Sequence, residues 1–516
     1  PAGPDCDDAA PAIHTDCDPS GVIRTEMGGA GAPFQGDTDG TRIEDGRVVL
    51  DGSGLAKLPP LIWVANSDEG TISKIDTKQL VELARYRTGP RPTPDVPDPS
   101  RTTVGPSGDV VVANRNGASA TRIAADATRC VDRNRNGRID TSTGPTDVRP
   151  WGADECVLWN VAFPPGSLGR AAAFDARIDI DVGDLRETVW IGLWTTRRML
   201  QLDAANGTIL DDIDVAPIRP YGAAADRGGG VWVWGNGIVR IDANHKVQRI
   251  PDPPAPGGNP CAYGIAIDAK QRVWTAGSGC VARFTPNGSP GGGGRWDEVS
   301  VGVYNRGIAL DGAGSVWVAD TDFGMHRLDE DSMSVLGEVP LPWSTFVGVA
   351  VDVERKVWAI ARGSSMAVRV DPLSYATVPI PVGQGPYTYS DMTGFQLRNA
   401  APPTGHFRHV FDGCAARPDL PAHFLALAFT ADTPPATALR FSARTADSRD
   451  GLKAAPWIPL AKVPSDKSPI DLAAALGPYA RGYVMELDVQ LASADPTQTP
   501  SLDHLVLSMD CLPPVQ

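Results

Sequence analysis

The chain has 516 residues and a formal net charge of −15. This length exceeds that of one small core and predicts roughly 2–4 domains, and the acidic balance excludes a nucleic-acid-binding surface, which needs a basic stripe. The 55 Gly and 47 Pro residues indicate many turns, whereas the 42% hydrophobic share argues against a disordered chain. No apolar run reaches the roughly 18 residues of a membrane helix, so we expect no transmembrane segment.

Residues 1–54 are rich in Gly, Asp and Pro, so we expect an acidic N-terminal segment without a core of its own. The stretch DCDDAAPAIHTDCD at 5–18 resembles a metal-binding repeat of surface proteins in some Gram-negative bacteria, with Ala10 replacing an Asn. The composition favours a solvated acidic leader or linker over a metal-binding segment. The chain opens at Pro1 without a Met, which fits removal of a leader, and a lipid anchor upstream of residue 1 would tether it to an outer membrane.

The eight cysteines fall into four sequential pairs, each within one segment of the chain. An even count, with no CxxC motif and no Cys/His cluster, favours disulfides over zinc. We therefore expect a secreted or cell-surface protein in an oxidising compartment, and free thiols in a cytosolic protein are the alternative. The predicted pairs are Cys6–Cys17, Cys130–Cys156, Cys261–Cys280 and Cys414–Cys511.

One short pattern recurs along the middle of the chain. Four intervals of 41–43 residues separate Trp190, Trp232, Trp274, Trp317 and Trp358. A period near 40–45 residues with four strands per unit is typical of propeller blades, so we expect an all-β fold with a seven-bladed β-propeller over 55–395. A β-sandwich or an open solenoid is the alternative. The motifs are IWVAN (62–66), VVVAN (110–114), VWIGL (189–193), VWVWG (231–235), VWTAG (273–277), VWVAD (316–320) and VWAIA (357–361).

The first unit lacks a first strand, and the missing piece follows the last unit. The stretch GPYTYSDMTG at 385–394 matches the first-strand pattern of the later units, such as PYGAAADRGGG at 220–230. We therefore expect residues 386–393 to pair with 61–66 and close the ring, which leaves only short outer edges.

Residues 58–394 resemble the YVTN and virginiamycin-B-lyase-like propeller superfamily. The residues that carry the resemblance are WVANSDEGTISKID at 63–76 and the G-φ-A-φ-D…VW repeats of the later blades. The resemblance implies a propeller, and for the lyases it implies acidic and His residues around the rim. Of the matching positions only Asp320 could bind a metal, and His326 is the one His in the inner repeat. The remaining matching positions are Asn66, Asn114, Leu193, Gly235, Gly277 and Ala361.

A calcium-loop motif interrupts the second blade, at about 126–160. The stretch DRNRNGRID at 132–140 matches D-x-[DN]-x-[DN]-G-x-I-[DN]. Thr143 stands where an EF-hand has its bidentate Glu, and Pro145 and Pro150 exclude an exiting helix, so we expect weak calcium binding or, alternatively, a plain polar turn. The predicted ligands are Asp132, Asn134, Asn136, the carbonyl of Arg138, Asp140, and one carboxylate from Asp147, Asp154 or Glu155.

Residues 396–516 lose the Trp repeat and contain alternating stretches such as YVMELDVQL. This period-two pattern is typical of half-buried antiparallel strands, so we predict a separate C-terminal β-sandwich. Its pattern resembles the jelly-roll or galactose-binding-like sandwiches of secreted bacterial proteins, without a sugar-binding motif.

Aromatic residues and Arg mark the loops over the propeller channel, where propellers usually bind ligands. Such residues suit sugar or peptide recognition, and packing between blades is the alternative for each. The candidates for binding at this rim are Asp68, Arg115, Tyr221, Tyr263, Arg306, Asp322, Phe346 and Arg362, together with Trp194.

The chain contains no GxSxG, HExxH, P-loop or CxxCH motif. The sequence therefore favours a non-catalytic extracellular or cell-surface binding or structural protein with a structural calcium ion. Its expected partner is a protein or a glycan at the cell surface. A virginiamycin-B-lyase-like lyase, or a hydrolase with a metal on the propeller rim, is the alternative.

Overall fold

The computed structural model describes residues 22–28, 31–51, 58–90, 97–179, 184–251, 261, 263–288, 293–389, 391–401, 403–414, 420–495 and 497–511. These residues divide into two compact units. The first, which we call the propeller unit, comprises 58–176 and 187–401. The second, which we call the two-sheet unit, comprises the described parts of 1–57, 177–186 and 402–516. Among the described residues, no helix is long and apolar enough to cross a membrane.

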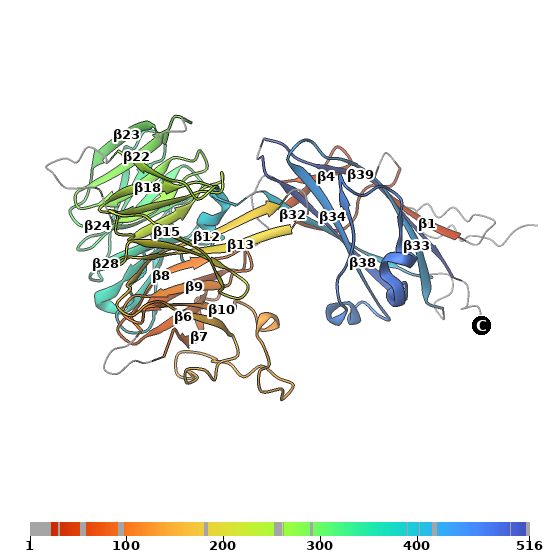
Figure 1. The fold of residues 1–516 in the computed structure, drawn as a ribbon, viewed down its shortest axis with the longest axis horizontal. Coiled ribbons are helices and arrows are strands. Elements are labelled where there is room, and N and C mark those ends of the chain that lie inside the picture. Colours follow the sequence, from red (N-terminus) through yellow and green to blue (C-terminus); the bar gives the residue numbers. More distant parts are fainter. Residues whose placement is uncertain are drawn as a thin grey trace, which may run out of the picture. The chain divides into compact units, whose positions relative to one another are not determined.

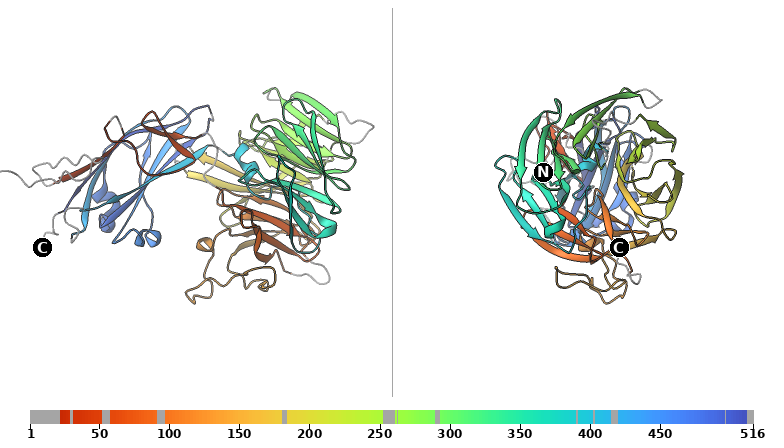
Figure 2. Two further views of the ribbon diagram at one scale, coloured as in Figure 1. Left: turned by 180° about the vertical axis from the view of Figure 1, so that it is seen from behind. Right: turned by 90° about the vertical axis from the view of Figure 1, so that its left-hand side faces the viewer.

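The propeller unit is built from antiparallel sheets that follow one another along the chain and form a ring (Figures 1 and 2). We call each sheet a blade and number the blades in chain order. The described strands form seven such sheets, each paired in the order of its strands. The strands of blades 1 to 3 are β5(Leu61–Asn66), β6(Thr71–Asp76) and β7(Val81–Arg87); β8(Pro99–Val104), β9(Val110–Asn114), β10(Ser119–Ile123) and β11(Val157–Ala162); and β12(Gly169–Asp179), β13(Asp184–Leu193), β14(Arg198–Asp203) and β15(Ile209–Asp214).

Blades 4 to 7 repeat the same arrangement. Their strands are β16(Gly222–Ala225), β17(Val231–Gly235), β18(Gly237–Ile241) and β19(Val247–Ile250); β20(Gly264–Ile267), β21(Val273–Gly277), β22(Cys280–Pro286) and β23(Gly294–Ser300); β24(Asn305–Leu310), β25(Ser315–Asp320), β26(Gly324–Asp329) and β27(Val335–Pro340); and β28(Phe346–Val351), β29(Val357–Ala361), β30(Met366–Val370) and β31(Thr377–Pro381). The first strands of blades 4 to 7 contact one another in succession, so they form the inner wall of the ring.

The Asp that follows the inner strand of blades 4 to 7 explains the repeat in the sequence. In blades 4 to 7 one carboxylate oxygen accepts a hydrogen bond from the indole Nε1 of the Trp six residues later, at 2.8–3.2 Å. The other oxygen accepts the backbone N–H four residues later. Because buried polar groups need partners, the repeat satisfies a buried Asp and a buried Trp together. The pairs are Asp226–Trp232, Asp268–Trp274, Asp311–Trp317 and Asp352–Trp358.

The closing segment, residues 385–394, completes blade 1. The N–H of Trp63 donates to the Met392 carbonyl at 2.9 Å, and the N–H of Tyr387 donates to the Ala65 carbonyl at 2.9 Å. Asn66 and Pro386 add a single antiparallel bridge. The predicted pairing of this segment with 61–66 is confirmed, although the described residues of the segment form no regular strand. It continues into η4(Phe395–Asn399).

The two-sheet unit consists of two antiparallel sheets (Figure 1). Buried side chains of both sheets, including Phe407 and Phe441 from one and Phe424 and Leu505 from the other, belong to one hydrophobic core. The first sheet contains β1(Val22–Met27), β3(Thr41–Glu44), β4(Arg47–Leu50), β33(Ala422–Asp432), β36(Ile470–Asp471), β37(Arg481–Gly482) and β39(Ser501–Asp510). The second contains β2(Asp37–Asp39), β32(Thr404–Asp412), β34(Thr437–Ala446), β35(Ile458–Val463) and β38(Val484–Ser493).

The division of the chain differs from the expected one at its N-terminal side. Residues 22–50, expected within an acidic segment without a core, supply strands to the two-sheet unit: β1 and β4 pair with β39, and β2 pairs with β32. Their partners follow several hundred residues later, so no local periodicity marks them. Residues 396–401, assigned from sequence to the C-terminal domain, belong to the propeller unit. The remaining short helices are η1(Ala127–Arg129), η3(Arg362–Ser364), η5(Gly451–Ala454), α1(Leu472–Leu476) and η6(Gly477–Tyr479).

Three of the predicted disulfides are confirmed: Cys130–Cys156, Cys261–Cys280 and Cys414–Cys511. The fourth predicted pair, Cys6–Cys17, lies outside the described residues. Disulfides persist in oxidising environments and are rare in the cytosol. The three disulfides therefore indicate an oxidising, extracellular compartment for this chain.

Candidate functional site

Tyrosine and arginine side chains from several blades converge in the middle of the ring. We call this group the Tyr/Arg cluster. Its contacts join blades that are not neighbours, such as blade 2 with blade 4 and blade 1 with blades 4 and 5, so the cluster spans the ring. Its members are Arg101 on β8, Arg115 after β9, Arg170 on β12, Tyr221 and Tyr263 directly before β16 and β20, Arg306 on β24, Arg362 in η3, and Tyr387 and Tyr389 in the closing segment.

The hydroxyl of Tyr387 is the meeting point of the other three phenols. It lies 2.6 Å from the Tyr263 hydroxyl, 3.3 Å from the Tyr221 hydroxyl and 3.4 Å from the Tyr389 hydroxyl. The rings of Tyr263 and Tyr389 also pack together, with centroids 4.6 Å apart. The closing segment therefore places one phenol at the centre of a hydrogen-bonded group.

Guanidinium groups cover the faces of these rings. The Arg101 guanidinium carbon lies 3.0 Å from the centroid of Tyr389, and those of Arg170 and Arg306 lie 4.6 and 4.4 Å from Tyr221 and Tyr263. Arg115 and Arg362 lie 5.3 and 5.2 Å from the centroid of Tyr387. Such cation–π contacts hold the positive charges together within one small region.

Two of the five arginines have carboxylate partners. Arg115 Nη2 donates to Asp98 at 2.6 Å, and Arg362 Nη2 donates to Asp68 at 3.2 Å. Arg101 instead donates to the Tyr221 carbonyl from Nε and Nη2, at 2.9 and 2.7 Å, and Arg306 donates to the Thr321 hydroxyl at 3.0 Å. Within the described residues, no carboxylate forms an ion pair with Arg101, Arg170 or Arg306.

The cluster perturbs the ionisation of its members. Burial alone would raise the pKa of Tyr387, but the hydroxyls of Tyr221, Tyr263 and Tyr389 and the charge of Arg101 stabilise its phenolate and lower the pKa to about 7. Burial lowers the pKa of Arg101, against the favourable influence of the tyrosines. For Tyr389, burial prevails and its pKa rises well above the usual value.

The structure brings together most of the predicted rim residues, and it places one of them in the hydrophobic core. Arg115, Tyr221, Tyr263, Arg306 and Arg362 lie in the cluster, and Asp68 reaches it through Arg362. Phe346 is wholly buried in the hydrophobic core of blades 6 and 7, so its prediction as a binding residue is wrong. Asp322 is exposed, with no described contact to the cluster, and Trp194 stacks with Arg219.

Four cluster members were not predicted as site residues: Arg101, Arg170, Tyr387 and Tyr389. Arg101 and Arg170 lie on inner strands that diverge from the repeat, PSRTTV and GRAAAF, so no motif marks them. A signal was present for the tyrosines, because GPYTYSDMTG aligns with PYGAAADRGGG and its Tyr387 matches Tyr221. The position of Tyr221 in blade 4, transferred to the closing segment, predicts Tyr387 as a rim residue.

The one His of the inner repeat is buried. His326 Nε2 lies 3.3 Å from Asp320 Oδ2, and the same carboxylate oxygen accepts the N–H of Val303 at 2.7 Å. Asp320 and His326 are 3% and 4% exposed. Asp320, which the family resemblance marked, is therefore enclosed with His326 in its own blade, and its carboxylate holds the loop before β24.

The loop 132–140 lies in the insertion between β10 and β11, and three of its side chains converge. The side-chain amides of Asn134 and Asn136 both donate to Asp140 Oδ2, at 2.7 and 2.8 Å. Asp132 accepts the N–H groups of Asn136 and Gly137, at 3.2 and 2.9 Å. Gly137 has φ +80°, a conformation that favours Gly, so the tight bend of the motif is present. Arg138 Nε lies 3.6 Å from Asp140 Oδ1.

Of the three candidate carboxylates for the end of the loop, Glu155 is the one that contacts it throughout. It accepts the N–H groups of Arg133, Asn134 and Asp140, at 2.8, 3.1 and 2.7 Å. These hydrogen bonds lower its pKa, the bond from Asp140 most. Asp154 is instead bound by Thr141 and Ser142, and Asp147 by Thr143.

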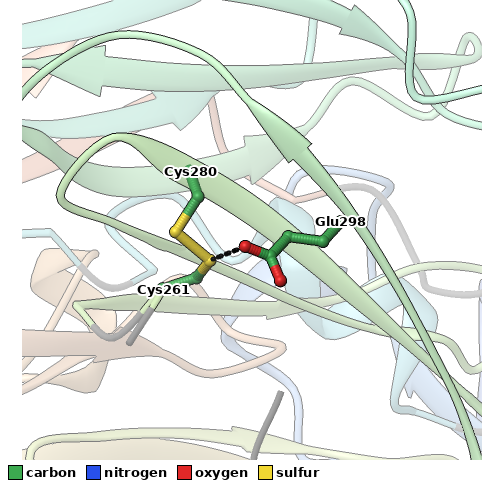
Figure 3. Close-up of side chains that lie close together, drawn as sticks. All are labelled: Cys261, Cys280 and Glu298. Atoms are coloured by element: carbon green, nitrogen blue, oxygen red, sulfur yellow. Dashed lines mark hydrogen bonds between the residues drawn. A yellow bond between two sulfur atoms is a disulfide. The ribbon is translucent and has the colours of Figure 1, made fainter. Parts of the chain in front are cut away.

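Cys261, Cys280 and Glu298 form another compact group (Figure 3). The two sulfurs are joined in a disulfide, and Glu298 Oε1 lies 3.5 Å from Cys261 Sγ. Burial raises the pKa of Glu298. Because a metal ligand must be a thiolate and not a disulfide sulfur, the group is a cross-link beside a carboxyl group.

No protein-family model and no curated protein matches this chain. Solved structures similar to it include virginiamycin B lyase from Staphylococcus aureus, at 15% identity over 56% of this chain and 87% of that chain, with a TM-score of 0.39. A streptogramin B lyase structure matches at 15% identity over 66% and 94%, with a TM-score of 0.42. A protein from Lactobacillus plantarum matches at 10% identity over 64% and 98%, with a TM-score of 0.45. These matches agree with the propeller resemblance of the sequence.

Proposed function

We propose that this chain is an extracellular, non-catalytic binding protein whose ligand site is the Tyr/Arg cluster. The convergence of five arginines and four tyrosines in the middle of the ring carries the proposal. A propeller offers a rigid scaffold on which side chains of several blades act together. The partner is a protein or a glycan at the cell surface, and the protein is secreted or held there by a lipid upstream of residue 1.

The test is a binding screen against panels of glycans and peptides, with Arg362→Gln as the cluster variant. Arg362 is partly exposed and paired with Asp68, so its replacement leaves the buried members in place. The expected result is a ligand whose affinity falls at least about tenfold in the variant, the loss expected for a hydrogen bond to a charged group. Arg449→Gln, which removes an exposed Arg paired with Asp412 in the two-sheet unit, is the matched control. Equal binding by both variants would show that the ligand binds outside the Tyr/Arg cluster.

We further propose that the loop 132–140 binds Ca²⁺ in a structural role. The convergence of Asn134, Asn136 and Asp140 supports this, because rotating the two amides turns their oxygens toward the same point as the carboxylate. Ca²⁺ takes such hard oxygen ligands, and the Arg138 carbonyl and Asp132 extend the set. Glu155 is the carboxylate that takes the place of the EF-hand Glu, since it already holds the backbone of the loop.

Calorimetry on chelator-treated protein tests this proposal. We expect millimolar or tighter Ca²⁺ binding, in the range of extracellular calcium modules, and its loss in Asp132→Ala. Asp147→Ala is the matched control, because Asp147 contacts Thr143 outside the loop. Ca²⁺ should also raise the melting temperature by binding the native state alone. If Ca²⁺ releases no heat and leaves the melting temperature unchanged, the loop is a polar turn.

A second candidate function is a lyase that uses Tyr387 in place of a rim metal. One observation favours it: Tyr387 has a pKa of about 7 beside Arg101 and Arg170, and a general base works best when its pKa is near the operating pH. The phenolate would take a proton from a carbon next to a carboxylate, and the leaving group would depart as the double bond forms. Ultraviolet absorbance of an unsaturated carboxylate product, absent with Tyr387→Phe, distinguishes this candidate from binding alone.

A further inference from the structure

The Tyr/Arg cluster offers donors and positive charge, and few free aromatic faces. Each of the four rings is covered by a guanidinium group within 3.0–5.3 Å of its centroid. Recognition of a neutral sugar usually needs an open aromatic face for stacking, and here each ring already has a guanidinium group near its centroid. What remains toward a ligand is the hydroxyl of Tyr387 and the N–H groups of the arginines.

The positive charges of the cluster exceed the negative charges around them. Arg115 and Arg362 are neutralised by Asp98 and Asp68. Arg101, Arg170 and Arg306 have no ion-pair partner among the described residues. Gathering like charges in a region of low dielectric is unfavourable unless a counter-charge is supplied. In the free protein a Tyr387 phenolate supplies at most one such charge.

Buried donors point to the same need. Arg101 is 1% exposed, and its Nη1 has no hydrogen-bond partner within the described part of the chain. The same is true of Nε and Nη1 of Arg170, which is only partly buried and so adjoins solvent. Buried polar groups in native proteins are almost always satisfied, so these unpaired N–H groups mark the position of an acceptor.

We propose that the Tyr/Arg cluster is a carboxylate-binding site, with Arg170 and the Tyr387 hydroxyl as the contacting donors and Arg101 as the buried charge beneath them. This inference rests on the proposed binding function and names the chemical class of its ligand. A carboxylate carries one charge and matches the planar guanidinium fork. A phosphate carries nearly two charges, and a long polyanion carries many, so the overall charge of −15 repels both more strongly. The ligand is therefore a small acid or a sugar acid such as a uronate.

Isothermal titration at low ionic strength with two matched sugars tests the assignment. D-glucuronate and D-glucose differ only at C6, which is a carboxylate in the first and a hydroxymethyl group in the second, and we expect binding of glucuronate and none of glucose. Arg170→Gln should weaken glucuronate binding at least about tenfold, because a hydrogen bond to a charged group is lost. Arg198→Gln is the control: it removes the same charge from the same blade, where Arg198 pairs with exposed Asp212. Salt should weaken the binding through screening.

Titrations with other ligands distinguish which chemical group the site recognises. Binding of acetate as well as glucuronate shows that the carboxylate alone is recognised, whereas binding of glucuronate only assigns a sugar acid. Preferential binding of inorganic phosphate overturns the carboxylate assignment. Glucose bound equally well, with loss in Arg170→Gln, overturns the charge inference while the proposed binding function stands. Arg101→Met adds a test of the buried charge, and its circular dichroism and melting temperature separate a folding defect from lost affinity.

Discussion

Asp391 in the closing segment makes the stability of the propeller depend on pH. Its carboxyl group borders a cavity of about 50 Å³ lined by the inner strands, and burial raises its pKa to about 6, against the N–H groups of Thr393, Val104 and Gly394. A carboxyl group whose pKa is higher in the folded state stabilises the fold fully below its unfolded pKa, near 3.8. That contribution is lost as the pH rises through about 6.

The magnitude follows from the size of the shift. A rise of about two pKa units corresponds to about 3 kcal/mol between acid and neutral pH. The perturbation is Asp391→Asn, which cannot titrate. Its amide also replaces an oxygen that accepts from Val104 and Gly394, at 3.3 and 3.1 Å. This cost does not depend on pH, so it cancels when two pH values are compared.

Urea unfolding of the propeller, followed by the fluorescence of its buried tryptophans, measures the effect. Between about pH 4 and pH 8, the free energy of unfolding of the wild type should fall by up to about 3 kcal/mol relative to Asp391→Asn. Asp322→Asn, an exposed substitution with the same change of charge, is the control. A constant difference between wild type and Asp391→Asn across this range would refute the reasoning.

Other predictions concern the remaining features. Absorbance of tyrosinate should rise near pH 7 in the wild type and not in Tyr387→Phe, because Tyr387 has a pKa of about 7. Replacing both Cys414 and Cys511 by Ser should lower the free energy of unfolding of the two-sheet unit by about 4–5 kcal/mol, since their bond closes a loop of 97 residues; an unchanged urea midpoint would contradict this. Deleting 385–394 should give aggregated or molten protein, because the partners of Trp63 and Ala65 are lost; cooperative unfolding at the wild-type temperature would show that the ring closes without it.

Features of the fold could be predicted from the sequence where they depend on residues close together in the chain. The Trp strands, the Asp six residues before the Trp of blades 4 to 7 and the sequential cysteine pairs are patterns within single segments of the chain. The structure contains them, except for Cys6–Cys17, which lies outside the described residues. The calcium motif is also local, and its side chains converge on Asp140. Strands β1, β2 and β4 could not be predicted, because they pair with strands near the other end of the chain.

The candidate site was visible only in part for the same reason. Tyr221 and Tyr263 repeat at one position of consecutive blades, so a pattern marks them. Arg101 lies in a strand with no repeat signature, and its importance arises from contacts across the ring with Tyr221 and Tyr389. Phe346 shows the opposite error, since an aromatic residue at a strand start was packing between blades. Side-chain convergence is a property of the closed ring and not of any one blade.

The closure of the propeller also governs the order in which the chain can fold. The hydroxyl of Thr41 donates to the carbonyl of His406, 365 residues later, so the two-sheet unit must join distant segments. The closed ring places Leu58 beside Gly394. Once it forms, only about 17 residues on one side and about 12 on the other separate these segments, and the entropic cost of joining them falls by about 2 kcal/mol. The closed propeller thus holds the distant segments of the two-sheet unit close together. We therefore expect the two-sheet unit to refold after the propeller has closed.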